Sequence, residues 1–246
     1  MPGGPSLFVT ARKLSVATGM LRPVLNVVLD LVLPPACAGC GAKGASCCPR
    51  CFGSLTRAPA RRGPVPSPPG LPDCWSAAPY EGAVRRMIVA YKERGAVALA
   101  GVLADALTRT VLMALGDWAG GRFAVVPVPS ARSSVRGRGH DPVGRLAVLV
   151  AARLRALGAG AEAWAGLGQS RRVADQAGLS RSLRAANLAG SLQVLPAANG
   201  PPAPVALLLD DIVTTGATLT EAARALRAAG IAVPLSVTAG ATRRRS

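Results

Sequence analysis

The fold is decided by the stretch Val205-Ala-Leu-Leu-Leu-Asp-Asp-Ile-Val-Thr-Thr-Gly-Ala-Thr218 and the residues that follow it. Residues 205–209 form an unbroken apolar run, which predicts a strand buried on both faces of a parallel sheet. Asp210 and Asp211 come next, so two carboxylates are expected at the carboxyl end of that strand. Residues 219–229 repeat apolar side chains at helical spacing, and a glycine follows at the position expected for C′. The stretch therefore predicts a strand, a short loop and a helix of an α/β fold.

A strand, a small-residue loop and a helix N-terminus together predict an anion site, because loop amides and the helix dipole point at the same ligand. The residues expected to hold a phosphate group are Val213 and the small or hydroxylated residues Thr214, Thr215, Gly216, Ala217 and Thr218. Asp210 and Asp211 would repel phosphate, so sugar hydroxyls are their expected partners, with Mg²⁺ second. A phosphorylated sugar satisfies both requirements. The alternative is an aspartate that only caps the helix.

Composition narrows the class of protein. The chain has 246 residues, of which 50% are hydrophobic, enough for one medium domain with a core, but only 3% are aromatic. Small aliphatic side chains must therefore fill the interior. The formal net charge of +17 favours polyanionic partners such as pyrophosphate, nucleic acid or an acidic membrane surface. No apolar segment is long enough to span a membrane and no cleavage-type site is found, so a cytoplasmic location is expected.

The N-terminal part predicts a helix followed by a metal site. Residues 1–19 are expected to be a loose start, and residues 20–33 a helix that ends at two prolines. Cys37-Ala-Gly-Cys40 and Cys48-Pro-Arg-Cys51 then form two Cys-x-x-Cys pairs, which fit four thiolates around one tetrahedral Zn²⁺. Disulfides or unused thiols are the alternative, and Cys47 could replace Cys48 as a ligand.

The chain divides into an N-terminal element and a main domain. Residues 20–55 hold the predicted helix and the zinc ribbon, and residues 56–73, rich in Arg, Pro and Gly, are interpreted as a linker. The main domain is expected over residues 74–242, with a basic tail at 243–246. Its first elements are expected to be a strand at 75–80 and helices at 82–94 and about 96–115.

A second anion site is predicted where the next strand, residues 123–128, ends. A basic, glycine-bearing loop follows that strand and suits pyrophosphate. The residues expected to bind there are Pro129, Ser130, Arg132 and Arg138. An ordinary exposed arginine loop is the alternative. His140, the only histidine, is left as either a positional residue or a catalytic base.

The remaining elements follow in order along the chain. Asp141-Pro142 predicts the N-cap and first residue of a helix that runs to about residue 157. Residues 163–195 are basic and irregular, as expected of a lid or hood inserted before the last strands. A final strand is expected at 231–239.

In this order the motifs resemble those of the competence protein F (ComF) family. The resemblance comprises the four cysteines, Tyr91-Lys92 at a helix end, Val-Pro-Val-Pro with its arginine loop, Arg-Arg-x-x-Asp-Gln at 171–176, and the stretch from residue 205. That last stretch is similar to the phosphoribosyl-pyrophosphate (PRPP) motif of type I phosphoribosyltransferases. The resemblance implies a zinc ribbon joined to a type I phosphoribosyltransferase domain, whose parallel sheet is flanked by helices and covered by a hood.

The resemblance also implies roles for residues. It assigns Asp210 and Asp211 to the ribose hydroxyls, residues 213–218 to the 5-phosphate, and the loop after Val128 to pyrophosphate, with Lys92 as a further pyrophosphate contact. It implies Zn²⁺ on Cys37, Cys40, Cys48 and Cys51. One departure matters: relatives usually read Arg-Gly-Phe-Asn-Gln where residues 138–142 read Arg-Gly-His-Asp-Pro. The amide pair is lost, which puts any acceptor contact made there in doubt.

The expected function is therefore transfer of the phosphoribosyl group from PRPP, with Mg²⁺, to an unidentified acceptor, with Asp210 and Asp211 as the catalytic residues. The alternative is a non-catalytic protein of the same fold that acts in DNA uptake and binds single-stranded DNA or competence-machinery proteins. A low aromatic content disfavours single-strand binding. A PRPP-sensing regulator is a third interpretation, and a homodimer is left open.

Overall fold

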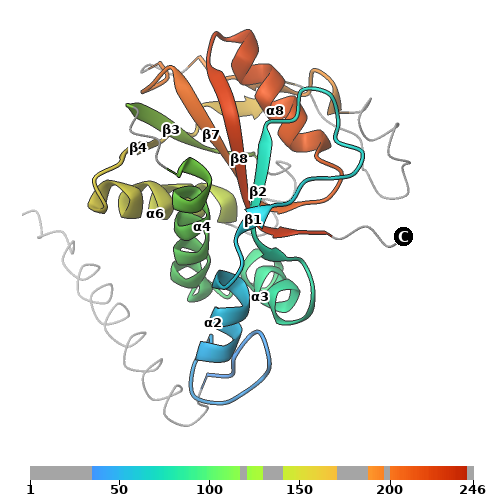
Figure 1. Cartoon of the computed structure of the whole chain (residues 1–246), viewed down its shortest axis with the longest axis vertical. Coiled ribbons are helices and arrows are strands. Elements are labelled where there is room, and N and C mark those ends of the chain that lie inside the picture. Colours follow the sequence, from blue (N-terminus) through green and yellow to red (C-terminus); the bar gives the residue numbers. More distant parts are fainter. Residues whose placement is uncertain (1–34, 117–120, 130–140, 171–187, 197–199, 243–246) are drawn as a thin grey trace, which may run out of the picture.

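The computed structural model describes residues 35–116, 121–129, 141–170, 188–196 and 200–242. Within these ranges a six-stranded, mostly parallel sheet is flanked by five helices (Figure 1). The α/β class expected from the sequence is therefore confirmed. The expected helix at 20–33, the loose start and the basic tail lie outside the described residues.

The elements alternate along the chain as an α/β fold requires. The helices are α2 (Pro49–Thr56), α3 (Gly82–Glu93), α4 (Leu99–Leu115), α6 (Pro142–Ala156) and α8 (Ala217–Ala228). Across the large sheet the strands are, in order, β1 (Ala60–Arg61), β2 (Asp73–Pro79), β8 (Ala232–Ala241), β7 (Val205–Val213), β3 (Arg122–Pro127) and β4 (Gly160–Ala163). The β1–β2 pair is antiparallel and the other pairs of this sheet are parallel. A separate antiparallel pair consists of β5 (Leu167–Gln169) and β6 (Leu192–Val194).

Strand β7 lies inside the sheet, between β8 and β3, as its apolar sequence predicts. Leu207 and Leu209 pack into the core on one face, whereas Ala206 and Leu208 pack into the core on the other. The strand is longer than expected, because its backbone remains paired with β8 as far as Val213. The two aspartates therefore lie within the last part of the strand and not after it.

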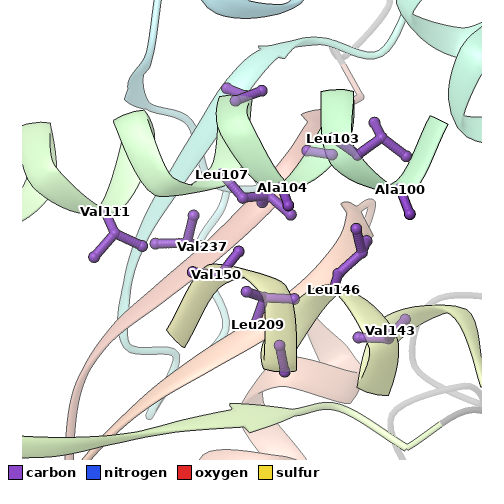
Figure 2. Close-up of a cluster of buried hydrophobic side chains, with 14 of the residues drawn as sticks. Ala100, Leu103, Ala104, Leu107, Val111, Val143, Leu146, Val150, Leu209 and Val237 are labelled. Atoms are coloured by element: carbon purple, nitrogen blue, oxygen red, sulfur yellow. The ribbon is translucent and has the colours of Figure 1, made fainter. Parts of the chain in front are cut away.

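The two faces of the sheet are covered by different helices. On one face α4 and α6 pack against the sheet, with Ala100, Leu103, Ala104 and Leu107 of α4 close to Leu146 and Val150 of α6 and to Leu209 and Val237 of the sheet (Figure 2). On the other face the core is formed with α8. Most of these side chains are Ala, Val and Leu, so small aliphatic residues fill the interior as the composition predicts.

The helix ends follow the sequence signals closely. Asp141 caps α6, and its side chain accepts a hydrogen bond of 3.0 Å from the Gly144 amide, with Pro142 as the first helical residue. Helix α8 begins two residues before the expected start and ends before Gly230, which has φ 78°. Among the described residues no helix combines the length and the apolar character needed to cross a lipid bilayer.

The stretch expected to be a linker has a defined place in the fold. Residues 60 and 61 form β1 at the edge of the sheet. Further along, the carbonyl oxygen of Gly70 accepts a hydrogen bond of 2.5 Å from the Arg227 guanidinium of α8. These contacts connect the Pro-rich stretch to both the sheet edge and α8 (Figure 1).

The β5–β6 pair lies beside α8 and is held there by charged groups. The buried Glu221 carboxylate accepts a hydrogen bond of 3.1 Å from the Leu192 amide. Arg224 donates to Glu221 (2.7 Å) and to the Leu192 carbonyl oxygen (3.0 Å). Both short strands fall within the segment expected to be irregular, of which residues 171–187 lie outside the described ranges.

The strand order reverses between β3 and β7. From β3 the chain passes through α6 to β4 on one side, and from β7 it passes through α8 to β8 on the other side. The helices α6 and α8 consequently lie on opposite faces of the sheet. In open α/β sheets, ligands bind outside the carboxyl ends of two strands that diverge in this way. The topology alone therefore places a candidate site at the ends of β3 and β7.

Candidate functional site

The end of β3 meets the acidic end of β7. Pro127 pairs with Leu209, and the Val128 amide donates a hydrogen bond of 2.9 Å to the Leu209 carbonyl oxygen. Pro129 is the last described residue on this side and lies half-buried next in the chain. The other expected pyrophosphate residues, Ser130, Arg132 and Arg138, and also His140, lie outside the described residues. Of the second predicted anion site, the described residues therefore place only its first member, Pro129, close to the acidic end of β7.

The loop after β7 forms a recess of about 30 Å³. Its lining contains all six residues expected for the phosphate group, together with Asp210, Ile212 and Leu219. Ile212 and Leu219 also line the recess and were not predicted, because neither side chain has a group that binds an anion. A recess of this size suits one small group, and its position at the N-terminus of α8 favours an anion.

Gly216 gives the recess its shape. It is the N-cap residue of α8 with φ 77°, a left-handed conformation that glycine adopts readily. A Cβ atom there would lie 3.1 Å from Pro64 Cγ and 3.3 Å from Leu71 Cδ1. The Pro-rich stretch therefore packs directly against the turn, so both the conformation and the space require glycine.

The two aspartates are on opposite faces of the strand. Side chains alternate along a strand, so Asp211 follows Leu209 toward the helices of one face, and Asp210 follows Leu208 toward α8. Asp210 lines the recess and is half-buried. Asp211 is only 4% exposed and is not part of the lining of this recess. From the sequence, both carboxylates are expected to have the same role, whereas in the structure each has different surroundings.

Lys92, in the last turn of α3, forms an ion pair with Asp211. The distance between Lys92 Nζ and Asp211 Oδ2 is 2.5 Å. Burial would lower the pKa of Lys92, but the carboxylates of Asp211 and Asp210 outweigh it and raise that pKa above its ordinary value. The sequence predicted Lys92 for the site but did not predict this pairing, because the two residues are more than one hundred positions apart.

The surroundings of Asp210 disfavour its charged form, whereas those of Lys92 favour the charged form. The pKa of Asp210 lies well above the usual range, first because the carboxyl group is withdrawn from solvent and second because the charge of Asp211 is adjacent. Lys92 lowers that pKa only in part. A carboxyl group with a raised pKa in a recess is a common feature of functional sites.

The four predicted cysteine ligands come together. The Sγ atoms of Cys37, Cys40, Cys48 and Cys51 all lie within 4.8 Å of one another. A tetrahedral Zn²⁺ with Zn–S bonds of about 2.3 Å needs sulfur atoms about 3.8 Å apart. Cys40 and Cys48 have a sulfur–sulfur distance of 3.7 Å, and none of the six cysteines forms a disulfide. The cluster therefore fits a metal ion such as zinc.

The surroundings of Cys37 favour its thiolate, whereas burial raises the pKa of Cys51. Burial raises the pKa of Cys37, but hydrogen bonds from the amides of Cys48, Cys40 and Gly39 outweigh it and lower that pKa to about 6. The Cys48 amide lies 3.3 Å from Cys37 Sγ. A Cβ atom at Gly39 would lie 2.7 Å from Cys51 Sγ, so the tight turn needs glycine for close approach to the sulfur.

Cys47 lies outside this cluster. Its Sγ is 3.6 Å from Met87 Sδ in α3, and burial raises the pKa of its thiol. The structure therefore resolves the alternative left open by the sequence in favour of Cys48 as the fourth candidate ligand.

No protein-family model matches this chain, and no curated protein matches it either. What is established is the α/β fold, the strand-end recess with its neighbouring ion pair, and the four-cysteine cluster.

Asp210→Asn and Asp211→Asn are expected to change stability in opposite directions at pH 7. Because the folded-state pKa of Asp210 is raised, the folded protein holds that proton more tightly than the unfolded chain. The stability contributed by this group is therefore present at low pH and is lost as the pH rises above about 4. Asp210→Asn avoids that loss, so it should raise the free energy of unfolding at pH 7 more than at pH 4.5.

Asp211→Asn, in contrast, leaves the Lys92 ammonium without its carboxylate and should lower the free energy of unfolding by about 1 to 3 kcal/mol. Urea unfolding of both variants at the two pH values measures these changes. Equal effects of the two substitutions would contradict the assignment of different roles.

Cys48→Ser and Cys47→Ser provide a matched test of the metal site. Purified wild-type protein is expected to contain about one zinc ion per chain, as four thiolates bind one tetrahedral ion. Cys48→Ser removes a ligand and should lower the zinc content strongly, whereas Cys47→Ser should retain it. Elemental analysis measures both, and loss of zinc in Cys47→Ser alone would contradict the structure.

Proposed function

We propose that this protein is a phosphoribosyltransferase, which binds PRPP with Mg²⁺ and transfers its phosphoribosyl group to an acceptor not yet identified. The observation that carries the proposal is the recess at the strand-order reversal, where a small anion site and Asp210 share one lining. A phosphate on a sugar requires this combination, because the phosphate needs amides and hydroxyls while the sugar hydroxyls need a carboxylate.

The proposed placement puts the 5-phosphate at the N-terminus of α8, within residues 214–218. A ribose hydroxyl then donates to Asp210, which lines the same recess. The pyrophosphate extends toward the end of β3 and toward the ammonium group of Lys92. Asp211 holds Lys92 in position, so the proposal gives the two aspartates separate tasks.

The reaction proceeds by breaking the bond between C1 of the ribose and the pyrophosphate oxygen, and the electron pair leaves with pyrophosphate. The ribose becomes oxocarbenium-like, and the Asp210 carboxylate, held close to the ring, offsets its positive charge. A lone pair of the acceptor forms the new bond to C1, and the acceptor releases a proton. Bound Mg²⁺, held mainly by substrate oxygens, supplies charge neutralisation to the pyrophosphate.

The proposal extends to the fold. The parallel sheet is that of a type I phosphoribosyltransferase, the β5–β6 pair is part of the hood, and the cysteine cluster is a zinc ribbon. The support is the resemblance of the motifs to the ComF family, together with their order along this chain.

PRPP binding and pyrophosphate release test the proposal. Titration calorimetry with PRPP and Mg²⁺ is expected to give a measurable heat, and Asp210→Asn should weaken binding by about 10- to 100-fold, because a charge-assisted hydrogen bond is lost. The matched control is Asp105→Asn on α4, where the carboxylate pairs with Arg153 at 2.6 Å, remote from the recess. Pyrophosphate release is then measured with ammonia, glutamine and nucleobases as acceptors. No heat with PRPP, or equal effects of the two variants, would overturn the proposal.

One observation favours a second candidate function, in which the protein binds single-stranded DNA. Residues 35–72 contain five basic residues and no acidic residue, and Phe52 on α2 is 37% exposed. A basic surface with an exposed aromatic ring is the minimal requirement for binding a single strand.

Salt dependence tests this second function. Each phosphate contact contributes about −0.7 to the slope of log K against log salt for single strands. A double variant, Arg50→Gln with Arg57→Gln, should therefore make the slope less negative by about 1.4. Arg122→Gln, at an exposed ion pair with Glu162 on the sheet, is the control and should have no effect. Equal slopes for wild type and the double variant would remove these residues from any DNA contact.

A further inference from the structure

Helix α3 spans the distance between the cysteine cluster and the candidate site. It has 12 residues and is therefore about 18 Å long. In Figure 1 it lies beside α2, the helix that carries Cys51, and it follows β2 at the carboxyl end of the sheet. The cysteine motif and the acidic motif do not by themselves predict that α3 contacts both sites.

The first turns of α3 contact the cysteine loop directly. Arg86 Nε donates a hydrogen bond of 2.5 Å to the carbonyl oxygen of Gly39, which lies between Cys37 and Cys40. Met87 Sδ is 3.6 Å from Cys47 Sγ, and Met87 is fully buried. The helix begins without a side-chain capping hydrogen bond, so packing against the cysteine loop contributes to holding its start.

The last turn of α3 contacts both sides of the candidate site. Lys92 pairs with Asp211 at the end of β7. Tyr91 is 1% exposed, and its hydroxyl donates a hydrogen bond of 2.8 Å to the Pro142 carbonyl oxygen. Pro142 begins α6, the helix that leads away from the β3 side of the site. One helical turn therefore connects to the two elements that diverge at the reversal of strand order.

The body of the helix can transmit a displacement from one end to the other. Val84, Met87 and Ile88 are buried in the same core cluster as Cys37 and Cys51. Packed interiors are dense and rearrange in discrete steps, so a shift of the cysteine loop moves the helix instead of being absorbed by voids.

We propose that a metal ion on the four cysteines positions Lys92 through α3, so that ligand binding at the recess depends on metal occupancy. This inference rests on the proposed function for the identity of the ligand. Without metal, residues 37–51 lose the four metal–sulfur bonds and keep only hydrogen bonds, such as that from the Ala38 amide to the Ser46 carbonyl oxygen (2.9 Å). The contacts of Gly39 and Cys47 with α3 then weaken, and the ion pair of Lys92 with Asp211 becomes less well held.

Hydrogen exchange of the protein without PRPP tests whether the metal ion stabilises α3. Zinc is removed with a chelator, the chelator is separated by gel filtration, and amide exchange is compared with that of the zinc-loaded protein. We expect faster exchange in the cysteine loop and also throughout residues 83–93. Faster exchange confined to residues 37–56, with α3 unchanged, would overturn the inference.

A ligand-binding cycle tests whether the coupling passes through Lys92. Zinc removal from the wild-type protein should weaken binding of PRPP with Mg²⁺ by about 10-fold, within the usual range of coupling between sites. In Lys92→Met, binding is weaker from the start, and zinc removal should have little additional effect, because coupled residues are not additive. The same fold-loss on zinc removal in Lys92→Met and in wild type would contradict the proposed path.

A variant that keeps the metal covers the case in which zinc removal unfolds the whole chain. Arg86→Gln loses the hydrogen bond to Gly39 but retains all four cysteines, and it should increase exchange at the end of α3 and weaken PRPP binding. Arg85→Gln, the exposed neighbour on the same helix, makes the same change of charge and should do neither. Equal behaviour of the two variants would overturn the inference. If PRPP does not bind at all, the proposed function fails, and the exchange data decide the coupling independently.

Discussion

The structure depends on the parallel pairing of β7 with β3 on one side and β8 on the other. Because β7 is interior, both of its edges are hydrogen-bonded and both of its faces are buried. The crossover from β3 through α6 to β4 and the crossover from β7 through α8 to β8 run in opposite directions, so α6 and α8 must lie on opposite faces of the sheet. That requirement opens the space between the ends of β3 and β7, and the candidate site lies there.

The same constraint explains why two adjacent aspartates have different surroundings. Pairing with β8 continues to Val213, so Asp210 and Asp211 keep the alternation of a strand. One carboxylate turns toward the recess at α8, and the other turns toward α3, where Lys92 pairs with it. A loop at this position would have allowed both carboxylates to face one ligand. The length of the strand thus determines the electrostatics of the site.

Local features could be predicted from the sequence and long-range ones could not. The apolar run of β7, the cap at Asp141 and the two Cys-x-x-Cys pairs each carry their information within a few residues, and each is found as expected. The Lys92–Asp211 ion pair and the packing of Pro64 and Leu71 against Gly216 join segments far apart in the chain. No periodicity or spacing encodes such contacts, so they become visible only when the sheet order is known.

The position of the charged groups relative to the core follows from their energetic cost. Asp211 is withdrawn from water and Lys92 is partly withdrawn, and such a pair gains little net stability because desolvation opposes its attraction. The cost is tolerable at the end of a sheet whose two faces are closely packed by alanine-rich helices. Small side chains allow dense packing of α4 with α6 and the sheet, and Ala100 and Ala104 of α4 lie within this buried layer (Figure 2). The apolar packing along the strands therefore supplies the stability, and the ion pair of Lys92 with Asp211 lies at the carboxyl end of the sheet.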